Sequence, residues 1–531
     1  MNHETIFDRF QALTFDDVVV IPGYSHVLPA DVDTSATFAG DIRLAVPLVS
    51  AAMDKVTESG LAIAIARRGG IGVIHRNLSI EGQAREVDRV KRSQSGMITD
   101  PVTLRPTATV GDAEQMMAAF HISGVPITDG DGRLVGILTN RDTRFMEPGD
   151  LDRPVSDFMT AQGLITASAT TTLAQAKAIL RVHRIEKLPL VDADGRLVGL
   201  ITVKDINKHT DNPFATQDSL GRLRVAAAVG VGPDLEARVE ALFDNFVDAI
   251  VIDTAHGHSA GVVEAIKRIK AVAPVLVVAG NVVTAEGVEA LFHAGADAIK
   301  VGVGAGSICT TRIIAGAGMP QLSAVYESSV AARRLGVPLI ADGGTRFSGD
   351  VVKAIAAGAH TVMLGSLLAG TDEAPGETEL FEGRRYKSYR GMGSLGAMQG
   401  HGADRYGSAQ GGSPQGGNAQ AGSAQGGSAQ GGSPQGGSAQ GGSAQGGSAR
   451  SNKAVPEGIE GRVPHAGSAA DVIDQLVGGL RSGMGYAGAA DLEELRTASR
   501  FMRVTTAGRD ESHPHDVEIT RAAPNYQVGM R

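Results

Sequence analysis

The feature that most constrains the fold is an alternation of short apolar runs and longer amphipathic stretches that begins near residue 222. The apolar runs cover residues 224–230, 249–253, 275–280, 298–304, 338–344 and 361–368. Val, Ile and Ala fill successive positions in them, which is typical of strands buried on both faces of a parallel sheet. Amphipathic helical patterns follow, for example at 260–272 and 348–358. The alternation therefore predicts repeated βα units.

Two earlier segments, 44–53 and 69–75, show the same pattern and bring the count to at least seven or eight units. That number favours an α/β chain closed into a (β/α)8 or TIM barrel over an open sheet. Glycine and polar residues follow several runs, as in VGVGAGSICTT and ADGGTRFSGD. Because barrel enzymes carry their chemistry at the C-terminal ends of the strands, we expect the functional site there.

A tandem repeat interrupts this pattern at residues 93–212. The first copy, about 93–150, contains HISGVPITDGDGRLVGILTNRD, and the second, about 155–212, contains HRIEKLPLVDADGRLVGLITVKD. Repetition of one unit predicts a module of two similar halves. The barrel is then predicted in two parts, 1–92 and 213–531, with this module inserted between them.

A low-complexity segment covers residues 407–450 and consists of pentads such as GGSAQ and GGSPQ. It holds no aromatic residue and no aliphatic side chain larger than those of alanine and proline. Such a segment cannot bury enough apolar surface to offset the entropy lost on ordering. We predict a coil without a packed structure.

Charge and cysteine content exclude several classes of protein. The formal net charge is −9 and the basic residues are spread along the chain, so nucleic acid is an unlikely partner. No stretch reaches the ~18 uninterrupted apolar residues of a membrane span, and the first residues do not resemble a secretory leader. The single cysteine excludes an intramolecular disulfide and is typical of a reducing compartment. We expect a cytoplasmic protein.

That single cysteine, Cys309, lies in VGVGAGSICTTR, where a predicted barrel strand ends in glycines. A lone cysteine is more often a buried filler of the core. Here the glycines permit unusual backbone angles and close approach of a ligand, and nearby backbone N–H groups would favour the thiolate. Cys309 is therefore also a candidate nucleophile.

The segment GAGSICTTR is similar to the signature of the IMP dehydrogenase and GMP reductase family. LTFDDV, PLVSAAMDKVTES, GGIGVIHRN, AGNVVT, KSYRGMGSLGAM and PEGIEGRVP resemble further family blocks, in family order, over the whole chain except 407–450. The repeats at 93–212 resemble tandem cystathionine-β-synthase (CBS) domains. The resemblance implies NAD-dependent oxidation of IMP to XMP through a covalent bond to Cys309, a K⁺ ion, and a homotetramer that can pair into an octamer.

The resemblance also assigns site residues. The catalytic residues would be Cys309, Thr311, Arg405 and Tyr406, the last two in a flap at about 384–467 that hydrolyses the covalent intermediate. IMP would be bound by Ser307, Asp342, Gly343, Gly344, Gly365, Ser366, Tyr389, Gly391, Met392, Gly393 and Glu457. NAD would contact Asp253, Gly302, Val303 and Gly304. The ion would take its ligands from Gly304, Gly306 and Cys309, and from Glu511, Ser512 and His513 of a neighbouring subunit.

Two other functions are compatible with these motifs. A GMP reductase shares the cysteine loop but uses NADPH and generally lacks the Arg405–Tyr406 pair, so this pair favours the dehydrogenase. A catalytically idle paralogue would only sense adenine or guanine nucleotides through its CBS-like pair, in which Asp142 and Asp205 match ribose-binding positions. Alternatively, the CBS-like pair binds no nucleotide and is a structural appendage. Intact Cys309 argues against an idle protein.

Some positions depart from the family pattern. Ala305 replaces a common proline in the cysteine loop, Gly407 replaces the phenylalanine that usually follows the Arg-Tyr pair, and VPHAG at 463–467 stands where VPYKG is usual. The low-complexity segment lies inside the flap. Since closure entropy grows only slowly with loop length, we expect it to weaken flap closure several-fold without abolishing it.

Overall fold

The computed structural model describes residues 11–94, 98, 101–120, 122–399, 455–521, 523, 525 and 526. Eight parallel strands close into a barrel in the order β11-β12-β13-β14-β15-β16-β4-β5. The predicted (β/α)8 barrel is thus confirmed. Its strands are β4 (Leu48–Ser50), β5 (Ile71–Ile74), β11 (Ala226–Val229), β12 (Ala249–Asp253), β13 (Leu276–Val282), β14 (Ala298–Val301), β15 (Leu339–Asp342) and β16 (Thr361–Leu364).

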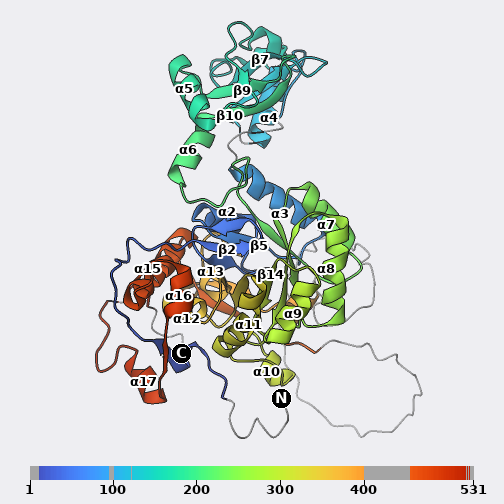
Figure 1. Ribbon diagram of the computed structural model, residues 1–531. Coiled ribbons are helices and arrows are strands. Elements are labelled where there is room, and N and C mark those ends of the chain that lie inside the picture. Colours follow the sequence, from blue (N-terminus) through green and yellow to red (C-terminus); the bar gives the residue numbers. More distant parts are fainter. Residues whose placement is uncertain are drawn as a thin grey trace, which may run out of the picture.

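Helices surround the barrel and connect its parallel strands (Figure 1). After β14, the short helix α10 precedes the long helix α11. After β16 and the short helix α13, the chain forms further strands outside the barrel before it returns to the helices α15 and α16. In chain order they are α2 (Ser59–Arg67), α3 (Ile80–Ser93), α7 (Leu235–Asp244), α8 (Ala260–Val272), α9 (Ala285–His293), α10 (Thr311–Ile314), α11 (Gln321–Leu335), α12 (Ser348–Ala356), α13 (Ser366–Ala369), α15 (Ala469–Ala487) and α16 (Leu492–Ala498).

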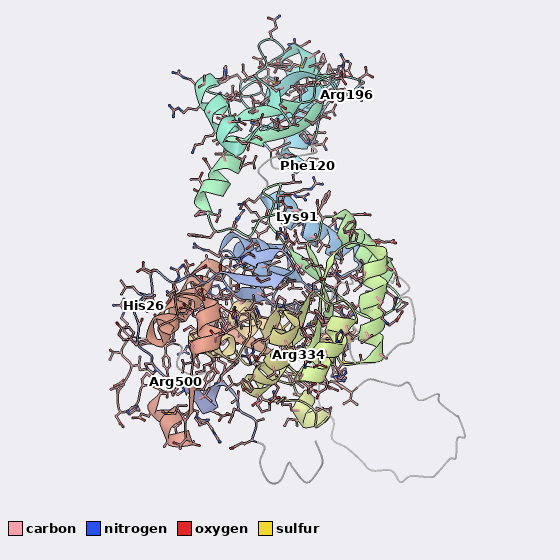
Figure 2. The ribbon with its side chains drawn as sticks, viewed as in Figure 1. His26, Lys91, Phe120, Arg196, Arg334 and Arg500 are labelled. Atoms are coloured by element: carbon pink, nitrogen blue, oxygen red, sulfur yellow. The ribbon has the colours of Figure 1, made fainter. Side chains whose placement is uncertain are left out.

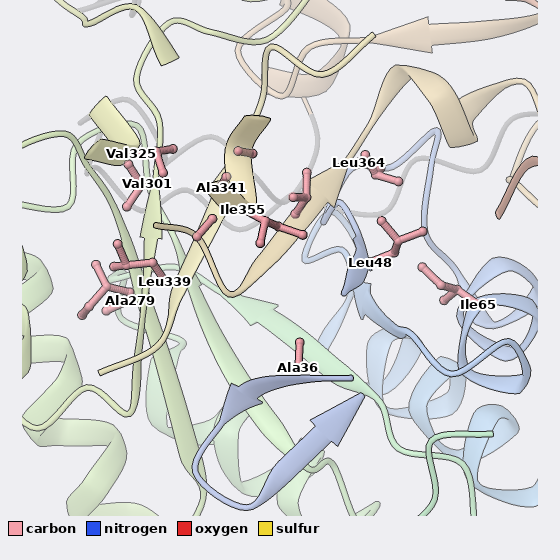
Figure 3. Close-up of a cluster of buried hydrophobic side chains, with 14 of the residues drawn as sticks. Ala36, Leu48, Ile65, Ala279, Val301, Val325, Leu339, Ala341, Ile355 and Leu364 are labelled. Carbon is pink, nitrogen blue, oxygen red and sulfur yellow. The ribbon is translucent and has the colours of Figure 1, made fainter. Parts of the chain in front are cut away.

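The strands are apolar on both faces because each face meets a different part of the core. Ala227 and Val229 belong to the cluster between barrel and helices, whereas Ala226 and Ala228 belong to the cluster inside the barrel. Figure 3 shows part of the outer cluster, with Val301 and Ala341 of the strands near Val325 and Ile355 of the helices. Alternate side chains therefore serve two cores, as parallel strands in a barrel require.

An antiparallel hairpin closes the N-terminal end of the barrel. It consists of β2 (Ala36–Ala39) and β3 (Ile42–Leu44), and its side chains Phe38, Ala39, Ile42 and Leu44 belong to the cluster inside the barrel. Phe38 is fully buried there. Because this end is filled with apolar side chains, only the opposite rim is left for a polar site.

A three-stranded antiparallel sheet stands above that opposite rim, in the order β17 (Thr378–Phe381), β18 (Arg384–Arg390) and β19 (Glu460–Pro464). α14 (Leu395–Met398) follows β18. Elsewhere β1 (Val18–Val20), preceded by η1 (Phe15–Asp17), pairs with β20 (Phe501–Arg503), so the first and last described parts of the chain meet; α17 (Thr506–Glu511) follows.

The chain between α3 and β11 projects away from the barrel (Figure 1). Since α3 ends and β11 begins at the N-terminal face of the strands, this insertion leaves from the end opposite the polar rim. Its elements are α4 (Val110–Ala119), β6 (Gly124–Thr128), β7 (Leu134–Thr139), η2 (Pro148–Asp150), η3 (Val155–Asp157), β8 (Ala167–Ser168), α5 (Leu173–His183), β9 (Lys187–Val191), β10 (Leu197–Thr202) and α6 (Val203–Asp211).

The insertion has two similar halves that contact each other reciprocally. Leu134 N donates to Gly195 O and Leu197 N donates to Gly132 O, both at 3.0 Å. These two bonds exchange equivalent positions of the repeat, as expected for halves related by a local twofold axis.

Lys91 joins α3 to the barrel at the end that faces the insertion (Figure 2). It is 3% exposed, and its Nζ lies 2.6 Å from Asp248 Oδ2 and 3.3 Å from Asp218 Oδ2.

Among the described residues, no helix has the length and apolar character needed to cross a membrane.

The role of the hairpin can be tested with Phe38→Ala. Removing a fully buried ring from a packed core should lower the free energy of unfolding by about 3–5 kcal/mol. The matched control is Phe214→Ala, because Phe214 is 70% exposed and should cost little. Urea unfolding followed by far-UV circular dichroism measures the free energy of unfolding of both variants. Equal losses of stability would contradict the role of the hairpin in closing the barrel.

Candidate functional site

A cavity of about 370 Å³ opens at the C-terminal ends of the barrel strands. Its wall comes from the loops after β4, β12, β14, β15 and β16, from the end of β18, and from residue Glu457. Predicted residues that line it are Asp253, Gly302, Val303, Gly304, Gly306, Ser307, Cys309, Thr311, Asp342, Gly343, Gly344, Gly365, Ser366, Tyr389, Gly391, Met392, Gly393 and Glu457. The structure thus brings together residues that span more than two hundred positions of sequence.

Cys309 lies between β14 and α10, in a loop whose path depends on glycine. Gly302 has φ 143° and Gly304 has φ 74°, and a Cβ on Gly302 would lie 2.1 Å from Asp342 O. The ends of β14 and β15 can therefore touch only with glycine at position 302. The loop then presents the half-buried Cys309 Sγ to the cavity, 3.1 Å from Thr311 Oγ1.

Two other segments hold this loop from above. Thr310 N donates to Glu457 O at 3.0 Å, Ile459 N donates to Ile308 O at 3.0 Å, and Glu457 N donates to Gly393 O at 3.1 Å. Pairing of β18 with β19, which sets Tyr389 opposite Gly461, brings these segments together. The sequence analysis did not predict the β17–β18–β19 sheet.

Tyr389 is buried in the cavity wall and is 5% exposed. Burial raises the pKa of its hydroxyl to about 12, although a hydrogen bond with Ser307 acts in the opposite direction. The phenol therefore stays protonated at neutral pH and can donate as well as accept hydrogen bonds.

A buried polar cluster forms the floor of the cavity, and two of its members were missed in the sequence. Lys300 Nζ lies 2.7 Å from Asp342 Oδ2 and 3.3 Å from Asp253 Oδ1. Asn281 Nδ2 donates to Asp342 Oδ2 at 2.9 Å, and Lys300 donates to Asn281 Oδ1. The available signal was a lysine in the apolar run AIKV, where only a paired charge is tolerated.

An ion pair fixes β18 to the loop after β4. Arg390 Nε donates to Asp54 Oδ2 at 3.0 Å, and Asn77 Nδ2 donates to the same oxygen at 2.7 Å. Burial would raise the pKa of Asp54, but the hydrogen bonds from Arg390 and Asn77 outweigh it and lower that pKa. Met53 and Tyr389, the sequence neighbours of the paired residues, line the cavity, so this ion pair joins two parts of the cavity wall.

Arg405 and Tyr406, like the segment 407–450, lie outside the described residues. The predicted tail residues are described but do not line the cavity. Glu511 ends α17, and His513 packs beside Phe347, with ring centroids 6.2 Å apart. Across the described ranges, no hydrogen bond joins Glu511, Ser512 or His513 to the cysteine loop of the same chain.

Metal ligation by side chains receives no support from the described part of the chain. No group of three His, Cys, Asp or Glu residues is placed there so as to hold a metal ion.

Comparison with known proteins shows which family the chain resembles. The model of the IMP dehydrogenase / GMP reductase domain matches residues 12–432 and 425–515. Proteins named inosine-5′-monophosphate dehydrogenase are 55% identical in Aquifex aeolicus and 53% in Halalkalibacterium halodurans, each over 98% of this chain and 98–99% of the relative. One from Streptococcus pyogenes is 52% identical over 99% of both chains.

Among solved structures, a GMP reductase variant from Trypanosoma brucei in complex with guanosine 5′-monophosphate superimposes with a TM-score of 0.83. It is 38% identical, and the match covers 97% of this chain and 100% of that one. Sequence and structure thus agree with the resemblance drawn from the GAGSICTTR motif, and the chain belongs to the IMP dehydrogenase / GMP reductase family.

Proposed function

We propose that the protein is an IMP dehydrogenase that oxidises IMP to XMP with NAD⁺. One observation carries this most directly: Cys309 faces a cavity whose wall contains every described residue that the family resemblance assigns to IMP and NAD. The relatives at 52–55% identity bear the dehydrogenase name, whereas the GMP reductase is 38% identical. The dehydrogenase is therefore favoured over the reductase.

The lining of the cavity supports one orientation for IMP. Ser307, Gly365 and Ser366 line the side where backbone N–H groups can bind its phosphate, the position usual in such barrels. Asp342 accepts hydrogen bonds from the ribose hydroxyls, because a carboxylate offers only acceptors. The base lies toward Cys309, between Tyr389 and the residues Gly391, Met392, Gly393 and Glu457; Gly343 and Gly344 let backbone approach the sugar.

NAD⁺ fits beside the base. Asp253 is 3% exposed yet lines the cavity, and it is placed to accept from a ribose hydroxyl of the cofactor. Gly302, Val303 and Gly304 offer backbone groups to its carboxamide. When bound, the nicotinamide supplies the acceptor for a hydride.

The chemistry then proceeds on Cys309. Its thiolate adds to C2 of the purine, the C2 hydride leaves with its electron pair, and a thioimidate remains on sulfur. Thr311, whose Oγ1 is 3.1 Å from Sγ, orients the nucleophile. Water then adds to C2 and the thiolate departs, which gives XMP and restores the enzyme. For this second step we propose Arg405 and Tyr406, which lie outside the described residues.

Cys309→Ala should lower NADH formation from IMP and NAD⁺ by more than about a thousandfold, because it removes the nucleophile. Absorbance of NADH measures the rate. Val330→Ala, at an exposed position of α11 on the outside of the barrel, is the control and should retain activity. NADPH consumption with GMP by the unmodified protein would instead identify a reductase, and silence with both substrate pairs would favour the nucleotide-sensing paralogue.

We also propose a monovalent cation, K⁺, at the cysteine loop and a homotetramer that completes its site. Gly304, Gly306 and Cys309 lie on the loop between β14 and α10 and line the cavity, and their backbone carbonyl oxygens are the ligands that we assign to the ion. Glu511 and Ser512 are exposed, and neither they nor His513 line the cavity of their own chain, so we assign all three to the site of a neighbouring subunit. The cation would hold the loop in the shape that the nucleophile needs.

Replacing K⁺ with Li⁺ at constant ionic strength should therefore reduce the rate of NADH formation several-fold. Glu511→Ala should raise the K⁺ concentration needed for half-maximal rate. Glu518→Ala, in the same tail, is the matched control and should leave it unchanged. Equal rates in both salts would refute the cation site.

For the insertion we propose a tandem CBS pair, residues 93–212, that binds adenine or guanine nucleotides. Two observations support it: the reciprocal bonds between the halves, and the matching places of Asp142 and Asp205. Each carboxylate caps its own turn, with Asp142 Oδ2 2.8 Å from Thr139 Oγ1 and Asp205 Oδ2 2.6 Å from Thr202 Oγ1.

ATP or GTP in excess should raise the thermal midpoint of the protein by a few degrees, because a ligand stabilises the state that binds it. The double variant Asp142→Asn with Asp205→Asn should lose this shift. Asp131→Asn with Asp194→Asn changes the exposed, repeat-equivalent pair nearby and should keep it. If neither nucleotide shifts the midpoint of the unmodified protein, the insertion is a structural appendage.

A further inference from the structure

Lys300 is the least expected residue of the cavity. It lies on β14, inside a run of apolar strand residues, and is 1% exposed. Gly280 on the neighbouring strand leaves room for it, since a Cβ there would lie 2.7 Å from Lys300 Cβ. A buried ammonium group costs several kcal/mol in lost hydration unless its partners are well placed. The partners of Lys300 therefore explain its presence.

Those partners come from three other barrel strands. Lys300 Nζ has three donor hydrogens and three acceptors around it: Asp342 at 2.7 Å, Asp253 at 3.3 Å, and Asn281 Oδ1. Asn281 Nδ2 also donates to Asp342 and to Gly302 O, at 2.9 and 2.7 Å. The ammonium group thus stands between two carboxylates that would otherwise repel each other in a dry part of the protein.

We propose that Lys300 is a positioning residue that serves both binding sites at once. This rests on the proposed function, in which Asp342 receives the IMP ribose and Asp253 receives the cofactor ribose. The Lys300 ammonium group lies between the two carboxylates, reduces their mutual repulsion and fixes Asp342 Oδ2 and Asp253 Oδ1, so that both side chains keep the orientation that ribose binding needs. Its loss misplaces both carboxylates together, whereas loss of either carboxylate affects one ligand first.

A comparison within the chain separates this role from plain stabilisation. Lys91 is also buried, at 3% exposure, and also joins two carboxylates, Asp218 and Asp248. It lies at the opposite end of the barrel and does not line the cavity. A variant of Lys91 therefore suffers the same kind of destabilisation without touching ligand binding.

The test uses the full-length protein with Lys300→Met, Lys300→Arg and Lys91→Met. KM for NAD⁺ and kcat come from NADH absorbance. Affinity for IMP comes from protection of Cys309, the only cysteine, against iodoacetamide. For Lys300→Met we expect both KM for NAD⁺ and the IMP concentration giving half protection to rise at least about tenfold, with kcat less affected. Lys300→Arg should recover part of both losses, and Lys91→Met should change neither.

Each other outcome overturns the inference. If Lys300→Met changes affinity for only one ligand, or lowers only kcat, Lys300 does not serve both carboxylates. If Lys91→Met weakens binding equally, the effect is general destabilisation, which thermal melting of the variants will reveal. If the unmodified protein makes no NADH, the proposed function fails, and IMP protection of Cys309 that Lys300→Met leaves unchanged then overturns the inference as well.

Discussion

Closure of the eight parallel strands is the constraint on which the rest of the structure depends. In a closed barrel every strand bonds to two neighbours, so all C-terminal ends meet at one rim. Residues as distant in sequence as Met53 and Asp342 become neighbours there. The apolar hairpin around Phe38 fills the other end. Polar chemistry is thereby confined to one side of the protein before any loop is considered.

Above that rim, a second layer completes the site. The β17–β18–β19 sheet delivers Tyr389 and Glu457 to the cysteine loop, and the Asp54–Arg390 pair ties this sheet to the barrel. Because the added segments bond to the loop through backbone N–H and C=O groups, the position of Cys309 depends on chain that follows it by more than a hundred residues. The barrel and the sheet act as one unit at this point.

Much of this was predictable from the sequence, for physical reasons. Strands buried on both faces show continuous runs of Val, Ile and Ala, which predict the barrel. Glycines at strand ends indicate that backbone or a ligand comes close there, which predicts the glycine-rich wall of the cavity. β17 is exposed at every position and β18 carries Arg and Lys, so neither shows an apolar pattern. Lys300 and Asn281 act through partners on other strands, which periodicity does not reveal. The roles of Arg405 and Tyr406 and of the tail remain hypotheses drawn from family resemblance.

The insertion leaves the barrel from the end opposite the cavity, and this separation has a consequence for how such a protein changes over evolutionary time. A stiff cylinder of strands lies between the two ends, with no loop common to both. Substitutions that alter the surface of the insertion leave the rim loops untouched, and changes in the rim loops leave the junction at Lys91 intact. The cavity loops and the insertion are thus open to selection independently.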